Sequence, residues 1–471
     1  MAADENVRRS GAEQVALRPV LDPGFEPAVR WQARYEREVA LAPDSVPVAL
    51  ALTRPDGAVS VVETRLLNVD PARHGATGRY LERLVKFLLW QRGGSRVVLC
   101  GSVAGADYLR GIYGPEGARA FDADVMGTRI FGEPFTVEAR PYEERPVARE
   151  AELALGGHLE GCRLGFDLGG SDRKCAAVRD GKVLFAEEIR WDPYFQADPA
   201  YHRDGINDSL RRAAAHLPRV DAIGGSAAGV YVNNQVRIAS LFRGVPAERF
   251  TAEVQSLFIE LQREWNVPLE VVNDGEVTAL AGAQEVGEGA LLGIALGTSC
   301  AAGYCNPAGN LTNWLNELAF VPVDYRPDGP QDEWSGDVGC GVQYFSQQAV
   351  ARLAPAAGFS FEAEMPFADR LLAVQRAMEQ DDPRARRIYE TIGSYLGWTL
   401  PLFARFYDLR HALLLGRVMS GPGGEVLLAT ARQVLAAEFP ELAGRLQLHQ
   451  PGESLKRHGQ AIAAASLPAV R

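Results

Sequence analysis

The sequence has few cysteines, no excess of positive charge and no long apolar run, and each absence excludes a class of protein. None of its six cysteines lies in a CxxC motif matched by a second one, so we expect reduced thiols and no cysteine-based metal site. The net charge of −11, with Arg and Lys scattered, argues against nucleic acid or an anionic membrane as partner. Because no uncharged apolar run reaches about 18 residues, we expect no signal peptide, no membrane span and a cytoplasmic location.

The remaining composition is that of an ordinary globular protein of more than one domain. A chain of 471 residues exceeds the size at which one hydrophobic core stops growing. Apolar strand patterns alternate with helical patterns from residue 163 onward, which favours α/β layers. We expect strands at 163–168, 183–189, 219–224, 269–273, 291–296 and 413–419. We expect helices near 206–217, 251–264, 277–285, 344–353, 385–406, 424–437 and 454–466.

The chain divides into five predicted segments. Residues 1–45 lack strong periodicity and are interpreted as a partly ordered lead-in. Residues 46–160 form an N-terminal α/β domain with a turn-rich connector, since 46–52 and 59–62 predict a hairpin, 78–91 a helix and 97–99 a buried strand. Two lobes follow at 161–280 and 281–452, and residues 453–471 form a C-terminal helix that returns to the first lobe.

A weak internal repeat links the N-terminal domain to the first lobe. Asp56–Gly57 matches Asp180–Gly181, and Gly101 matches Gly225, both at an offset of 124 residues. Either the domain is a degenerate copy of the first lobe, or two unrelated β-turn-β-helix-β units share the same turn chemistry. If it is a copy, it lacks the glycine-rich element that precedes the second one.

Two glycine-rich turns follow predicted strands and suit phosphate oxygens. The first comprises Asp167, Gly169, Gly170 and Ser171, where backbone N–H groups and a hydroxyl could meet phosphate and Asp167 could hold Mg²⁺ through water. The second comprises Gly297, Thr298 and Ser299. Taken alone, each motif is more often a plain hairpin than a nucleotide site.

A polar pair ends the predicted strand at 269–273 and begins the next helix. The carboxylate of Asp274 would lie at the crevice where open α/β sheets bind ligands, and phosphoryl transfer needs one group to accept a hydroxyl proton. The alternative role for Asn273 and Asp274 is that of a helix N-cap, which the local sequence alone favours. Near the C-terminus, a further strand-to-helix turn with Gly421, Gly423 and Gly424 offers a flat surface for a nucleoside.

In this order, the motifs resemble the nucleotide site of the actin, Hsp70 and hexokinase superfamily, and within it the ROK family of bacterial sugar kinases and repressors. The likeness covers about residues 162–468. It includes NDGEVTALAGA at 273–283, LGTSCAAGY at 296–304, NELAF at 316–320 and HGQAIAAASLP at 458–468. The resemblance implies a two-lobed ribonuclease-H-like fold, here with an additional N-terminal α/β domain.

The resemblance also implies an activity and its residues. It implies an ATP-dependent and Mg²⁺-dependent kinase acting on a small sugar or polyol, with Asp274 as general base. It assigns the acceptor to Asn273, Glu317 and Gly229, and Mg-ATP to the glycine turns. A homodimer is left open.

The acceptor half of the family pattern is altered. In the family's E-x-G-H element Glu317 is retained, but Ala319 replaces the Gly and Phe320 the zinc-site His. The zinc loop keeps one thiol, Cys340, and Val342 replaces a sugar-binding Glu. We therefore predict no structural zinc, because one thiolate cannot complete a tetrahedral site. A sugar derivative or cyclitol is favoured over glucose, since the lost carboxylate would leave a glucose hydroxyl unpaired.

Two other functions fit the same pattern. The first is a non-catalytic sugar-binding or regulatory protein whose N-terminal domain engages a protein partner; DNA binding is disfavoured because the chain is acidic and residues 1–150 do not resemble a winged helix. The second is an ATPase or phosphatase on the same fold.

Overall fold

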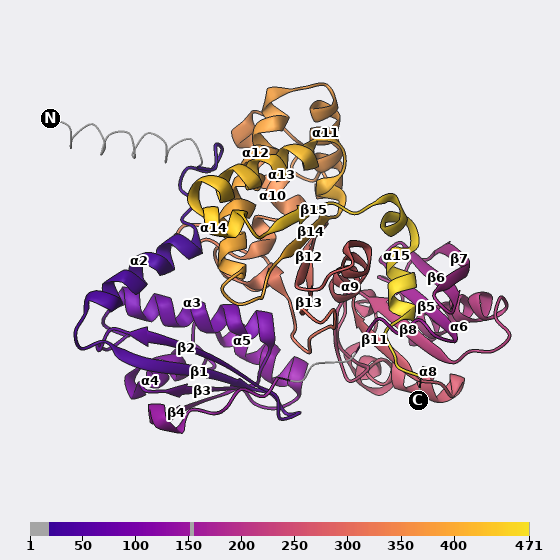
Figure 1. The fold of residues 1–471 in the computed structure, drawn as a ribbon, viewed down its shortest axis with the longest axis horizontal. Helices are drawn as coiled ribbons and strands as arrows, with labels where there is room; N and C mark the ends of the chain where they lie inside the picture. The colour runs from indigo at the N-terminus through magenta and orange to yellow at the C-terminus, as the bar shows by residue number, and fades with distance from the viewer. Residues whose placement is uncertain (1–17, 151–154, 471) are drawn as a thin grey trace.

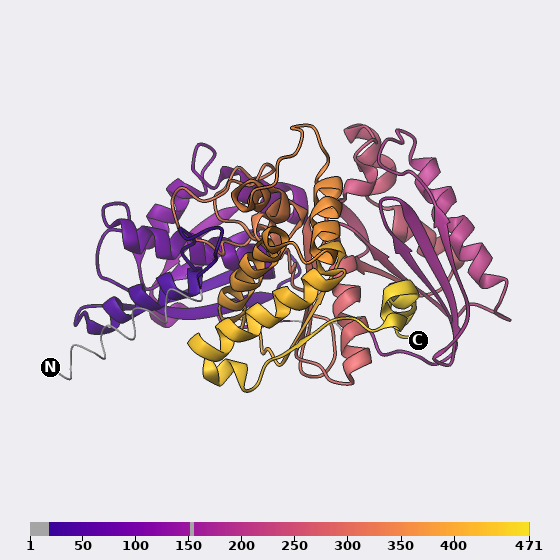
Figure 2. The same ribbon diagram turned by 90° about the horizontal axis from the view of Figure 1, so that it is seen from above.

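The computed structural model of the protein describes residues 18–150 and 155–470. In this part of the chain it shows three sheets of four or five strands with their covering helices, and one two-stranded sheet (Figures 1 and 2). Figure 1 shows the N-terminal part, drawn in indigo and purple, beside a central region that separates it from the remaining sheet. No helix among the described residues is both long and apolar enough to cross a membrane. All six cysteines are buried and free of disulfides.

The N-terminal part is a four-stranded sheet in the order β2-β1-β3-β4 with helices around it. Its elements are α2 (Ala28–Leu41), β1 (Val46–Thr53), β2 (Val59–Leu66), α3 (Gly75–Arg92), β3 (Arg96–Cys100), α4 (Val103–Ile112), α5 (Ala120–Asp124), a π-helix (Val125–Phe131) and β4 (Thr136–Arg140). Residues 1–45 are predicted to be a partly ordered lead-in; residues 1–17 lie outside the described part of the chain, and the rest contains α2, which buries Trp31, Tyr35 and Val39. These three residues recur every four positions, which is the helical spacing that could have revealed the helix.

The second sheet has five strands in the order β11-β8-β5-β6-β7. Its elements are β5 (Cys162–Leu168), β6 (Asp172–Arg179), β7 (Lys182–Arg190), α6 (Pro199–Ala214), β8 (Ala222–Ala227), α8 (Leu257–Trp265) and β11 (Leu269–Asn273), with a small β9–β10 hairpin (Val230–Val232 and Gln235–Ile238). β5, β8 and β11 run parallel, so their carboxyl ends meet at one edge. This sheet has its own hydrophobic core, which includes Phe166 and Phe258.

The third sheet, β13-β12-β14-β15, lies at the centre of the molecule with a helical layer. Its elements are α9 (Asp274–Val286), β12 (Leu291–Leu296), β13 (Cys300–Cys305), α10 (Gln347–Ala357), α11 (Phe367–Glu379), α12 (Pro383–Phe403), β14 (His411–Leu415), α13 (Pro422–Glu438), α14 (Pro440–Ala443) and β15 (Gln447–His449). α15 (Glu453–Ala465) then crosses back and packs on β5, β6 and β8. Figure 1 shows this crossing in yellow.

The N-terminal sheet and the central region share one continuous hydrophobic core. The shared core contains Trp31 and Trp90 from the N-terminal part and Tyr344 and Tyr395 from the central region. Phe25 joins the two directly, since its ring lies 4.8 Å from that of Tyr395 and 5.6 Å from that of Tyr344. A contiguous core of this kind normally belongs to one folding unit, so the N-terminal part is built into the central region rather than attached to it by a linker.

Strand directions bear on the proposed duplication. The order β2-β1-β3-β4 contains an antiparallel pair, a second antiparallel pair and a parallel pair. In the five-stranded sheet, the strands β7, β6, β8 and β11 have the same relative directions in the same order. The difference is that β5 lies between β6 and β8. The N-terminal sheet thus corresponds to the first lobe without the strand that leads into the first glycine turn. Duplication stays a prediction; if it holds, the missing strand would account for the missing phosphate element.

Candidate active site

Asp167 lies at the carboxyl end of β5, opposite Ser226 of β8. The Ser226 hydroxyl donates a 2.7 Å hydrogen bond to Oδ1 of Asp167, and the Lys174 ammonium lies 3.6 Å from Oδ2. Burial raises the pKa of Asp167 above its ordinary value, although Lys174 and the Ser226 hydroxyl act in the opposite direction. The strand end therefore presents a desolvated carboxyl group that a cation would convert fully to the ionised form.

The turn after β5 brings Gly169, Gly170 and Ser171 to the surface beside this carboxyl. The Gly169 carbonyl accepts a 2.8 Å hydrogen bond from the Trp191 indole, which fixes the turn. A side chain at Gly170 would meet the Tyr194 hydroxyl at 2.0 Å, so a larger residue here would displace the Tyr194 ring. The Ser171 hydroxyl donates to Asp172 at 2.8 Å. The turn is thus a rigid hairpin with an exposed rim.

Asn273 and Asp274 join β11 to α9, and both take part in capping the helix. The Gly275 N–H donates to Oδ1 of Asn273 at 2.7 Å and to Oδ1 of Asp274 at 3.0 Å. The Asn273 amide also donates to the Gly229 carbonyl at 2.7 Å, which ties the loop after β8 to the end of β11. The helix-cap role weighed for this pair is thus present in the local structure, and Gly229, which was also predicted for the acceptor site, is hydrogen-bonded to Asn273.

Three carboxyl groups gather at the amino end of α9. Burial and, secondarily, the charge of Asp167 raise the pKa of Asp274 to about 6. Burial and the charge of Asp274 raise the pKa of Glu317 to about 7. Glu276, which sequence reasoning did not assign, has a pKa raised to about 8, mainly by burial and also by Glu317. The motif NDGE could have indicated Glu276, because a carboxylate two residues after Asp274 falls within the same helical turn.

The second glycine turn joins β12 to β13 in the central sheet. Thr298 and Ser299 are exposed, and the Gly297 N–H donates to the Ser299 carbonyl at 2.9 Å. The Gly297 carbonyl accepts from Gln347 at the start of α10. The hydroxyls therefore stand free of the sheet on a turn that is held from two sides.

The third glycine-rich stretch begins α13 and borders a small pocket. Gly421 and Gly423 line it together with Glu379 of α11 and Tyr389 of α12. The Tyr389 hydroxyl is buried without a hydrogen-bond partner. Gly424 is not part of the lining, and a Cβ at this position would point at the Met419 carbonyl, 2.1 Å away. Two of the three predicted nucleoside-contacting glycines thus face an open space that also offers an unpaired polar group.

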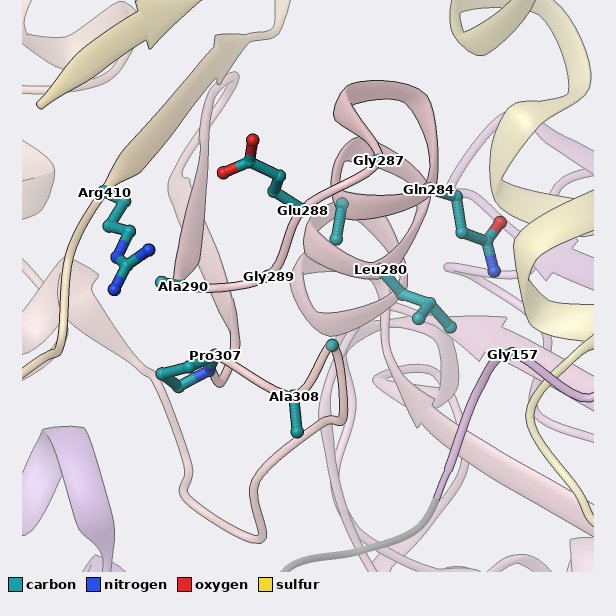
Figure 3. A pocket seen from close by; sticks show the side chains of 12 residues that line it. Gly157, Leu280, Gln284, Gly287, Glu288, Gly289, Ala290, Pro307, Ala308 and Arg410 are labelled. Atoms are coloured by element: carbon teal, nitrogen blue, oxygen red, sulfur yellow. The ribbon is translucent and has the colours of Figure 1, made fainter.

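A different pocket lies at the opposite end of α9 (Figure 3). Leu280 and Gln284 of α9 form one side of it, Arg410 the other, and the loop around Gly287 and Glu288 lies between them. It contains none of the predicted catalytic, acceptor or nucleotide residues. The chemistry-bearing residues therefore gather at the amino end of α9.

The segment that corresponds to the family's zinc loop is held by ion pairs. Arg83 makes a bidentate pair with Asp337 at 2.7 and 3.1 Å, and Arg119 and Lys86 lie 2.7 and 3.3 Å from the same carboxylate. Burial would raise the pKa of Asp337, but the three cations outweigh it and hold the pKa well below its usual range. Within residues 18–150 and 155–470, no group of three or more His, Cys, Asp or Glu could hold a metal ion.

The comparisons identify the fold. No protein-family model matches the sequence, and no curated protein does. A ROK hexokinase from Thermus thermophilus superimposes with a TM-score of 0.51 at 19% identity, covering 64% of this chain and 96% of its own. A ROK family transcriptional regulator, a homologue of the E. coli MLC protein, gives 0.52 at 22% identity, covering 66% and 78%. These likenesses confirm the predicted two-lobed fold.

Proposed function

We propose that this chain is a ROK-type kinase that transfers the γ-phosphoryl group of ATP to a hydroxyl of a sugar, sugar derivative or cyclitol. The observation that carries the proposal is the position of Asp274, a partly buried carboxyl group with a pKa of about 6 at the carboxyl end of β11. The charge of Asp167, which precedes the first glycine turn, raises the pKa of Asp274, and the charge of Asp274 raises that of Glu317, so Asp274 lies within electrostatic range of both. Sugar kinases are among the proteins that share the fold.

Asp274 suits the role of general base. A base works best when its pKa lies near the operating pH, because it is then both ionised and able to hold a proton. The helix-capping bond uses Oδ1 of Asp274, and a carboxylate has a second oxygen to accept the hydroxyl proton. Capping also fixes the side chain, so the two roles weighed for Asp274 are compatible. The proton would leave the acceptor hydroxyl for Asp274 as its oxygen bonds to phosphorus and the bond to ADP breaks.

The residues around Asp167 fit a magnesium nucleotide. Mg²⁺ retains several waters and is commonly held by one or two carboxylates together with phosphate oxygens, so a single desolvated carboxylate is a sufficient protein contribution. Mg²⁺, when bound, neutralises charge on the phosphates. Gly169, Gly170 and Ser171 would face the phosphates from one side and Thr298 and Ser299 from the other. Gly421 and Gly423 would lie beneath the nucleoside.

The acceptor would be oriented by Glu317 and by the remaining amide hydrogen of Asn273. Val342, where the family has a sugar-binding Glu, is buried and cannot pair with a hydroxyl. A glucose hydroxyl at that position would lose its partner at a cost of about 1 to 3 kcal/mol. We therefore favour an acceptor that is substituted or lacks a hydroxyl at this point.

The test is acceptor-dependent ADP release from Mg-ATP with glucose, N-acetylglucosamine, N-acetylmannosamine and myo-inositol. Asp274→Asn retains an oxygen that can cap α9 but removes the base, so we expect a loss of at least about 100-fold in kcat with ATP affinity within about twofold. Asp204→Asn, on the exposed side of α6, is the matched control and should leave the rate unchanged. The proposal fails if no acceptor in an extended panel gives ADP release that depends on Asp274. Strong ADP release without any acceptor would indicate an ATPase instead.

The second candidate is a non-catalytic sugar-binding or regulatory protein, and the structural likeness to a transcriptional regulator favours it. Calorimetry separates the two candidates. A regulator would bind one of these sugars without turnover of ATP, and its affinity would be the same for wild type and Asp274→Asn in the presence of nucleotide.

A further inference from the structure

The carboxyl end of α3 contacts the loop that carries Glu317. The Glu317 N–H donates to the Trp90 carbonyl at 3.0 Å, and the Asn316 N–H donates to the Gln91 carbonyl at 2.9 Å. Carbonyls in the last turn of a helix have no partner within the helix, so they accept hydrogen bonds from N–H donors elsewhere. The loop with the proposed acceptor carboxylate supplies these contacts, and the N-terminal sheet and the candidate site are thereby joined through the backbone.

The Trp90 side chain holds this helix end in place. Its indole N–H donates to Oδ1 of Asp122 at 2.6 Å. Its ring lies 4.5 Å from that of Phe320, three residues beyond Glu317. Phe320 also contacts Trp334, at 4.8 Å, from the segment that precedes Asp337. Trp90 therefore supports the loop at two points. Its carbonyl accepts from the Glu317 N–H, and its ring packs against Phe320.

A buried and charge-balanced ion cluster anchors Trp90 in turn. Lys86 is fully buried and pairs with Asp122 at 2.7 Å and with Asp337 at 3.3 Å. The cluster consists of three cations and three anions, each less than 9% exposed: Arg83, Lys86 and Arg119 with Glu82, Asp122 and Asp337. Removal of one member of such a cluster leaves an uncompensated buried charge, so its members hold one another in a single arrangement.

We propose that α3 of the N-terminal domain positions the acceptor carboxylate Glu317, with Trp90 as the positioning residue. The inference rests on the proposed function and extends it, because it makes the N-terminal domain part of the acceptor site. The domain supplies from within the same chain the rigid support that keeps Glu317 aligned with Asp274. Misplacement of a substrate-orienting group by about 1 Å can cost on the order of 100-fold in rate.

The test compares two substitutions at Trp90 with a control in the same shared core. Trp90→Ala removes the ring and the indole N–H, whereas Trp90→Phe retains a ring for Phe320 and loses only the bond to Asp122. Trp31→Ala is the control, since Trp31 is a buried tryptophan of α2 that packs on Tyr35 and Tyr325. Two readouts are measured on the full chain: hydrogen exchange at the amides of residues 316 and 317, and the KM values for acceptor and ATP.

We expect Trp90→Ala to speed exchange at residues 316 and 317 and to raise the acceptor KM at least about tenfold, with the ATP KM within about twofold. Trp90→Phe should lie close to the wild type in both exchange rate and acceptor KM. Trp31→Ala should lower Tm without changing the acceptor KM. The inference is overturned if exchange stays at the wild-type rate in both Trp90 variants, or if exchange rises while the acceptor KM does not. In either case the kinase proposal stands. Absence of acceptor-dependent turnover in the wild type would overturn the kinase proposal and this inference with it.

Discussion

The carboxyl groups of Asp274 and Glu317 lie close enough that the charge of Asp274 adds to burial in raising the pKa of Glu317 to about 7. The two groups come from different sheets, since Asp274 follows β11 and Glu317 follows the central hairpin of β12 and β13. Among the described residues, no cation offsets the effect of burial on the pKa of either carboxyl group. Their ionisation therefore depends on pH in the neutral range, and so should the acceptor chemistry.

The first prediction concerns the pH dependence of the reaction. Asp274 must be ionised to accept a proton and Glu317 to accept hydrogen bonds from the acceptor, and their pKa values are about 6 and about 7. We expect kcat/KM for the acceptor to fall steeply below these values and to level off near about pH 8, one unit above the higher pKa. A profile that is flat from about pH 5 to about pH 8 would contradict this assignment. The measurement is acceptor-dependent ADP release across the pH range in one mixed buffer of constant ionic strength.

The second prediction concerns stability and Glu276, whose pKa rises from 4.5 to about 8, mainly through burial. Between these values the folded state holds a proton that the unfolded state has lost. The contribution of Glu276 to the free energy of unfolding is therefore most favourable below pH 4.5 and is lost as the pH rises toward 8. Glu276→Gln mimics the protonated form, so the Tm advantage of the variant should grow from about pH 5 to about pH 8. An equal Tm difference at both pH values would show that Glu276 keeps an ordinary pKa.

Local patterns predicted most of the fold, and the misses have physical causes. The strands around Asp167 and Asp274 follow from buried apolar runs that end in polar residues, and the parallel pairing then places both at one edge. α2 was missed because charged residues lie between its buried positions Trp31, Tyr35 and Val39. Its helical spacing was present in the sequence, but the surrounding charge hid it.

The support of the acceptor loop could not be predicted from the sequence. Arg83 and Asp337 are 254 positions apart, and the match of a buried cation to a buried anion at that distance depends on the tertiary structure. The resemblance to ROK proteins predicted that most of their zinc ligands are absent here, but it did not indicate what supports this segment. The periodicity of the sequence does not indicate that α3 provides the support, because Arg83 and Lys86 of this helix resemble a solvated helix face.

The third prediction concerns metals. Because Asp337 is held by Arg83, Lys86 and Arg119, we expect purified protein to contain less than about 0.1 zinc per chain, and a zinc-selective chelator to leave Tm and activity unchanged. Removal of Mg²⁺ by EDTA should abolish ADP release, and added MgCl₂ should restore it. The measurements are elemental analysis, thermal melting and the coupled assay. A Tm that falls on zinc chelation would show that the ion cluster is not the support of this segment.

The last prediction tests the nucleoside end of the site with two glycines at positive φ. Gly421 and Gly287 have φ of +73° and +79° but ψ of −167° and 11°, and a side chain at either position would meet no atom within 4 Å. Alanine should therefore cost stability at both positions, on the order of 1 kcal/mol at Gly287, which is left-handed, and more at Gly421, whose backbone is essentially accessible only to glycine. Only Gly421 borders the pocket with Tyr389, whereas Gly287 borders the pocket at the far end of α9. If the nucleoside binds at Gly421, then Gly421→Ala should raise the ATP KM about tenfold and Gly287→Ala should leave it unchanged. An ATP KM that stays at the wild-type value in Gly421→Ala, measured at a temperature where thermal melting shows both variants folded, would place the nucleoside elsewhere.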